Sequence, residues 1–176
     1  LIRKKDCTET DYSTVFYFNF ATGVIFFLIL FFSAPLISAF FNEPQLINLL
    51  KILGLVLIID SLTMIQRTTL TKRIDFKLQT KISLISSLVS GAIAITMAYS
   101  GFGVWSLVFK TISQRAFTSL LLWLWNRWRP LMLFSMKSFK ELFSFGSKLL
   151  ISGLIDTAYT NIYYLVIGKN FSAQEL

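Results

Sequence analysis

Five ionisable residues interrupt stretches of sequence that are otherwise apolar, and they are the residues best placed to do chemistry. They are Lys51, Asp60, Lys110, Arg115 and Asp156. A charge at the centre of a bilayer costs about 2.5–3.5 kcal/mol on insertion scales, so such residues usually face a bundle interior or a wet cavity. Lys51 and Asp60 lie near the ends of their stretches, where they can snorkel or pair locally. Arg115 lies near the middle of its stretch.

The polar residues of the stretch 104–125 gather on one side of a helical wheel. At about 100° per residue they fall within an arc of roughly 200°, and they are Ser106, Lys110, Thr111, Ser113, Gln114, Arg115 and Thr118. In the stretch 149–167, Asp156 and Thr160 share a face with small residues. These faces suit either a buried Arg–Asp pair or a solvated cationic cavity for an anionic substrate, since Arg and Lys bind phosphate and carboxylate oxygens. We expect a substrate-binding cavity formed by Arg115, Lys110, Gln114, Asp156 and Thr160.

Asp156 has two possible roles in such a cavity. Pairing with Arg115 is favoured, because an isolated buried anion and an isolated buried cation would each be costly. The alternative is that Asp156 carries an exchangeable proton. The chain has no His, which removes the usual proton carrier near neutral pH.

The residues that catalysis and metal binding most often use are scarce. Besides lacking His, the chain has a single cysteine, Cys7, so neither a disulfide nor a Cys-based metal site can form within it. A membrane-embedded glycosyltransferase or polymerase would need a catalytic carboxylate or His cluster, usually in a sizeable loop, and the sequence shows none. We therefore predict no catalytic residue, no metal site and no cofactor.

Five apolar stretches position these residues, at roughly 15–32, 46–65, 82–98, 104–125 and 149–167. Each is close to the ~20 residues that a helix needs to cross a hydrocarbon core of ~30 Å. The chain is 55% hydrophobic and 15% charged, whereas soluble domains average about 45–50% and about 25%. A soluble bundle of this size could not cover its outside with polar groups. The sequence predicts an all-α, polytopic transmembrane helix bundle of about five spans.

Lys and Arg lie in alternate connections between these stretches. Residues 1–12 hold three of them, 66–81 five and 127–148 five, whereas the turns 42–45 and 100–103 hold none. The positive-inside rule therefore predicts that residues 1–12, 66–81 and 127–140 are cytoplasmic. The net charge of +8 then reflects topology and attraction to anionic membrane lipids, and no nucleic-acid partner is expected.

Several local expectations concern the ends of the spans. We expect the first helix to start near Asp11 or Ser13 and Pro35 to bend its last turns. Trp128 is expected to anchor the membrane interface, and residues 135–145 to lie in that interface. Small residues of the third span share a face suited to close packing, and they are Ser83, Ser87, Ser90, Gly91, Ala94 and Ala98.

Four segments resemble the polysaccharide flippases of the Wzx type, in the order and at about the spacing seen in that family. They are Ala34 to Pro44, Gln66-Arg67 with Lys72 to Lys77, Gly101 to Leu107, and Trp128-Arg129-Pro130 with Phe143 to Lys148. The resemblance covers essentially the whole chain. It implies the multidrug/oligosaccharidyl-lipid/polysaccharide exporter superfamily, whose members have two lobes of six helices around a central cavity.

The resemblance implies that residues 1–130 form helices three to six of the N-lobe. Residues 131–176 would form the inter-lobe linker and helix seven, the first of the C-lobe, so the chain is expected to be a fragment of that fold. The implied function is flipping of undecaprenyl-diphosphate-linked oligosaccharides for O-antigen, capsule or exopolysaccharide across the bacterial inner membrane. A proton or sodium ion is a possible coupling ion. A multidrug or lipid II exporter of the same superfamily is the alternative.

Overall fold

The computed structural model describes residues 7–126 and 128–170, with the side chains among them other than those of residues 145 and 163–170. The helices are α1 (Glu9–Phe41), α2 (Leu46–Lys72), α3 (Phe76–Tyr99), α4 (Val104–Trp125) and α5 (Met136–Asn170). The described residues include no strand. The predicted all-α fold is confirmed.

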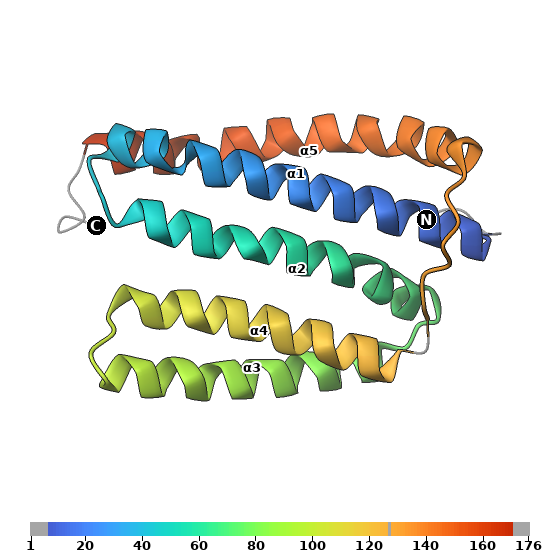
Figure 1. Ribbon diagram of the computed structural model, residues 1–176, viewed down its shortest axis with the longest axis horizontal. Helices are drawn as coiled ribbons and strands as arrows, with labels where there is room; N and C mark the ends of the chain where they lie inside the picture. The colour runs from blue at the N-terminus through green and yellow to red at the C-terminus, as the bar shows by residue number, and fades with distance from the viewer. Residues whose placement is uncertain (1–6, 127, 171–176) are drawn as a thin grey trace.

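The helices form two antiparallel hairpins with a fifth helix beside them (Figure 1). α1 packs against α2 and α3 against α4, α2 joins the hairpins by packing against α4, and α5 lies along α1. The turns 42–45 and 100–103 lie at one end of the bundle, whereas the α2–α3 turn and the segment before α5 lie at the other (Figure 1). The connections rich in Lys and Arg therefore share one end.

The exterior of the bundle is apolar and much of its interior is polar. Large apolar side chains are exposed along the helices, whereas most buried side chains belong to Ser, Thr, Asn or Gln. Within the described residues, α1, α2 and α3 are long and apolar enough to cross a membrane. Over their described residues, α4 and α5 have the length but not the same sustained apolar stretch. This distribution, the reverse of that in a water-soluble bundle, belongs to a multi-pass membrane protein.

α1 begins earlier than the predicted Asp11 or Ser13. Thr8 is its N-cap: the Thr8 side-chain oxygen accepts the N–H of Asp11, and the Asp11 carboxylate accepts the N–H of Thr8. This reciprocal capping satisfies two backbone donors and adds a turn ahead of the apolar stretch. Pro35 lies inside α1, which continues to Phe41.

The predicted 66–81 loop is wrong in its extent. α2 continues to Lys72, and α3 begins at Phe76 with Asp75 as its cap, the Asp75 carboxylate accepting the N–H of Leu78 at 3.1 Å. The turn between them holds Ile74 at φ 56°, a left-handed conformation that is uncommon for a β-branched residue. Most cations of this segment therefore lie on helix ends. Hydropathy falls where a helix leaves the hydrocarbon, which need not be where its hydrogen bonds stop.

The segment before α5 packs into the bundle. Trp128 is only 5% exposed, packs against Phe16 and Ile65, and donates its indole N–H to Glu9 at 2.8 Å. The prediction of an interfacial anchor is therefore wrong, because the ring fills space between α1 and α2. Nearly all of residues 135–145 belong to one continuous helix, α5, which also holds the predicted fifth span; their location in the membrane interface stays a prediction.

α1 and α2 are closely packed at Gly23. A Cβ atom there would lie 2.9 Å from the Cβ of Ser61 and 3.1 Å from the carbonyl oxygen of Leu57, so a side chain would push the helices apart. The predicted small face of α3 is used only in part. Ser90 is buried, whereas a Cβ at Gly91 would meet no described atom within 4 Å.

Candidate functional site

Arg115 lies near the middle of α4 and forms an ion pair with Asp60 of α2. The Nη1 atom of Arg115 lies 3.4 Å from Oδ1 of Asp60, and each side chain is 42% exposed. Since α2 and α4 belong to different hairpins, the pair bridges the two. Both charges also remain accessible to a ligand.

The ion pair lies in the wall of a pocket of about 340 Å³ between α1, α2 and α4, which we name the Arg115 pocket. Its polar lining residues are Asn19, Thr22, Asp60, Ser61, Thr63, Arg67 and Arg115. Two arginines face one aspartate, so one positive charge is left over. Such a surplus suits an anion, which can accept charge-assisted hydrogen bonds from a guanidinium.

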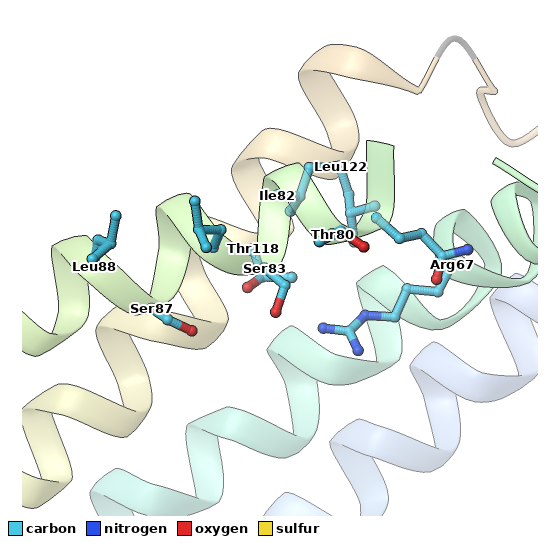
Figure 2. A pocket seen from close by; sticks show the side chains of 10 residues that line it. Arg67, Thr80, Ile82, Ser83, Ser87, Leu88, Thr118 and Leu122 are labelled. Atoms are coloured by element: carbon cyan, nitrogen blue, oxygen red, sulfur yellow. The ribbon is translucent and has the colours of Figure 1, made fainter. Parts of the chain in front are cut away.

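A larger pocket of about 580 Å³ lies between α2, α3 and α4, and we name it the Arg67 pocket. Figure 2 shows Arg67 reaching from α2, with its guanidinium directed toward the side where Ser83 and Ser87 of α3 lie. Thr118 of α4 also lines this pocket. Because Arg67 lines both pockets, they meet at its side chain.

The other two predicted site residues of α4 lie in different surroundings. Nε2 of Gln114 donates to Oγ of Ser87 at 3.0 Å, which ties α4 to the wall of the Arg67 pocket. Lys110 is exposed and is not among the residues that line these two pockets. The three predicted site residues of α4 therefore have different surroundings: Gln114 bridges to α3, Arg115 forms an ion pair with α2, and Lys110 is exposed.

Asp156 and Thr160 are exposed on α5, which packs against α1 alone among the described helices. Oγ1 of Thr160 donates to the backbone oxygen of Asp156 at 2.9 Å. The predicted pairing of Arg115 with Asp156 is wrong: α1 and α2 lie between α4 and α5 (Figure 1), and Asp60 is the partner of Arg115. Substrate binding by Asp156 and Thr160 stays a prediction.

Two residues of α2 matter more than the sequence pattern suggested. Hydropathy places Arg67 in a loop and gives Asp60 a local role, whereas both line the Arg115 pocket. Their spacing of seven is the signal that could have joined them, since residues seven apart share a helix face. The spacing is informative only if Arg67 lies in the same helix as Asp60, that is, if α2 continues past Ile65.

Long helices with an apolar exterior and accessible charges between them define a multi-pass membrane protein with a polar interior groove. The described residues hold no group of three or more His, Cys, Asp or Glu side chains that could bind a metal ion. The sequence family described as polysaccharide biosynthesis protein matches residues 1–176, and the chain belongs to this family. The predicted resemblance is thereby confirmed.

Three curated relatives are similar to the chain at low identity. The teichuronic acid biosynthesis protein TuaB of Bacillus subtilis (strain 168) is 28% identical over 100% of this chain and 37% of its own length. The succinoglycan biosynthesis transport protein ExoT of Rhizobium meliloti (strain 1021) is 28% identical over 83% of this chain and 30% of its own length. The lipopolysaccharide biosynthesis protein WzxC of Escherichia coli (strain K12) is 26% identical, over 98% and 36%.

The chain thus spans about a third of the length of these relatives. No solved structure matches it.

Proposed function

We propose that the chain is part of a transporter that flips undecaprenyl-diphosphate-linked oligosaccharides across the bacterial inner membrane. The observation that carries the proposal is the Arg115 pocket, in which two arginines and one aspartate lie among hydroxyl and amide groups between apolar helices. A diphosphate or an acidic sugar would bind the surplus cation. The rest of the longer protein would complete the cavity and turn it from one side of the membrane to the other.

The relatives' names support this proposal. All three names include the word biosynthesis, and the name of ExoT also includes the word transport. A biosynthetic protein built of membrane-spanning helices is more readily understood as moving a membrane-bound intermediate than as synthesising it. We accordingly propose transport rather than catalysis.

Each predicted site residue has a place in this proposal. Arg115 and Lys110 attract the anionic groups, and Gln114 and Thr160 offer hydrogen bonds to sugar hydroxyls. With Arg115 held by Asp60, Asp156 is free for the second role foreseen for it, that of binding a coupling proton or sodium ion. This role needs α5 to face the part of the cavity that the rest of the protein supplies.

The same fold suits a second candidate, an exporter of lipid II. Its headgroup also carries a diphosphate, so a surplus cation would serve it equally. A multidrug exporter for cationic compounds is disfavoured by the two arginines of the Arg115 pocket. Gene neighbourhood separates the candidates, because adjacent glycosyltransferase genes favour the oligosaccharide flippase.

Orientation in the inner membrane is part of the proposal. We propose that residues 1–12, 66–81 and 127–140 face the cytoplasm, with residues 1–130 in the N-lobe and 131–176 forming the linker and first helix of the C-lobe. Single cysteines at Gln45 and Lys77, both exposed, in a Cys7→Ser background test this orientation. An impermeant thiol reagent should label position 45 and not 77 in intact cells. Equal labelling of the two would contradict the orientation.

The decisive experiment replaces Arg115 in the full-length protein. Arg115→Ala should lower polysaccharide export several-fold without lowering membrane abundance, and Arg115→Lys should keep part of the activity, since Lys keeps the charge but not the bidentate geometry. Normal export by the alanine variant would exclude Arg115 as a substrate contact. Loss of the protein from the membrane would make Arg115 a structural residue.

A further inference from the structure

Arg67 carries the positive charge that the Arg115–Asp60 pair leaves over. Asp60 is held by Arg115 at 3.4 Å, and Arg67 has no acidic partner within the described part of the chain. Its side chain is exposed and lines both pockets. Its guanidinium, with five N–H donors in a planar fork, is therefore available to a ligand.

Hydroxyl groups of α3 face the same space. Ser83 and Ser87 lie one turn apart on the wall of the Arg67 pocket, toward which the Arg67 guanidinium points (Figure 2). The Ser87 oxygen accepts the hydrogen bond from Gln114, so its own hydrogen remains free to donate. Ser83 forms no hydrogen bond through its hydroxyl to any described residue. A guanidinium beside hydroxyl donors is a suitable set for the oxygens of a phosphate.

An apolar surface borders this polar set. Leu84 and Leu88 line the Arg67 pocket from the same helix, and they are 60% and 66% exposed. Exposed leucines offer nothing to a water-soluble anion, but they can contact a hydrocarbon chain. Charge, hydroxyls and leucines together match a ligand with a phosphate head and an apolar tail.

We propose that the Arg67 pocket binds the phosphate end of a polyprenyl-linked substrate before that substrate reaches Arg115. Arg67 and Ser83 bind the phosphate oxygens, and Leu84 and Leu88 contact the first part of the lipid tail. The assignment of the lipid rests on the proposed function. Because Arg67 also lines the Arg115 pocket, a phosphate bound to it is already at the edge of that pocket.

Binding to the purified full-length protein tests this proposal. The probes are a polyprenyl diphosphate, phosphatidylglycerol and inorganic phosphate, each titrated by native mass spectrometry or by competition. Arg67→Gln should weaken polyprenyl diphosphate binding about tenfold or more, as expected for loss of a hydrogen-bonded charge. Arg67→Lys should restore part of it, and Ser83→Ala should weaken it by a smaller factor. The matched control is Arg73→Gln, an exposed arginine at the end of the same helix, which should change binding less than about twofold.

Three results would overturn the proposal. One is equal binding of polyprenyl diphosphate by the wild type and a folded Arg67→Gln variant with an unchanged melting temperature. Another is equal affinity for phosphatidylglycerol, which would make this a site for bulk lipid. The third is inorganic phosphate binding as tightly as the lipid, which would leave the leucines without a role.

The proposed function can fail separately. Arg115→Gln should lose export yet still bind the probe through Arg67. If export is unaffected by Arg115→Gln while Arg67→Gln still weakens probe binding, the Arg115 site is refuted and the Arg67 pocket stands.

Discussion

Polar residues gather in two regions of the bundle, a buried clamp at the end that holds the α2–α3 turn and the accessible groove formed by the two pockets. The clamp consists of Ser13, Thr14, Gln66, Thr69, Asn126 and Trp128. Gln66 donates to the backbone oxygen of Trp128 at 3.2 Å, and Asn126 donates to the Gln66 backbone oxygen and to Oγ1 of Thr69 at 3.1 and 2.7 Å. Ser13 and Thr14 accept backbone N–H groups from the segment before α5, at 2.9 and 3.0 Å.

The groove also consists of polar side chains, but these are accessible and not buried. Asp60 and Arg115 are half-exposed and Arg67 has no acidic partner among the described residues. In the clamp the side-chain amides of Gln66 and Asn126 are buried and donate hydrogen bonds, whereas their acceptor oxygens have no partner among the described residues. Buried polar groups that donate hydrogen bonds between elements fix one helix against another, whereas accessible ones keep capacity for a ligand. Burial, more than residue type, separates structure from binding in this molecule.

The clamp should be the most sensitive part of the fold. Trp128→Ala removes a buried ring and the hydrogen bond to Glu9, and it should lower the free energy of unfolding by about 3–5 kcal/mol. Trp125→Ala, which removes a ring that is 38% exposed, is the matched control and should cost much less. Thermal and denaturant unfolding of the full-length protein in detergent measures both. A similar decrease in the free energy of unfolding for the two variants would contradict the distinction between the clamp and the surface.

The helix contact at Gly23 should give a smaller effect. Gly23→Ala places a methyl group against Ser61, and the resulting overpacking should cost about 1–3 kcal/mol. Gly91→Ala is the control, because its Cβ meets no described atom within 4 Å and alanine is the better helix former by about 1 kcal/mol. The two melting temperatures should move in opposite directions. A stabilising Gly23→Ala would show that the hairpin can open at that point.

The ion pair of the groove should contribute least to stability. A double-mutant cycle with Asp60→Asn and Arg115→Gln should give a coupling energy of about 0.2–1 kcal/mol, as for other accessible pairs. Export should nevertheless fall in the Arg115 variant. A coupling energy above about 3 kcal/mol would place this pair with the clamp, as a structural element.

The helices and their hairpins were predictable because apolar length and short turns determine them. Each of the five predicted spans lies within its own helix, although only the span 104–125 has the limits of that helix, and the tight turns 42–45 and 100–103 force their neighbours to be antiparallel. The helix ends were less predictable. Polar residues such as Gln66 end an apolar stretch without ending a helix, so hydropathy predicts an α2 that is too short and places Arg67 in a loop.

The partner of Arg115 could not be obtained from the sequence. A helical wheel shows which face of α4 is polar, but not which helix lies opposite it. Packing of α2 against α4 decides in favour of Asp60. The prediction for Trp128 was wrong for a related reason. A tryptophan among arginines is compatible both with a lipid interface and with the space between two helices. Only the structure, in which this segment packs against α1 and α2, distinguishes the interfacial position from the buried one.

The hydrogen bonds from Ser13 and Thr14 to the backbone of Leu131 and Ser135 have a consequence for biosynthesis. A chain emerging from the ribosome completes both hairpins before these partners exist, because residues 13 and 131 are far apart in sequence. Until then the hydroxyls of Ser13 and Thr14, near the start of α1, lack those donors. These contacts therefore cannot form until synthesis has passed α4, and a chain stopped earlier would lack the segment that covers Ser13 and Thr14.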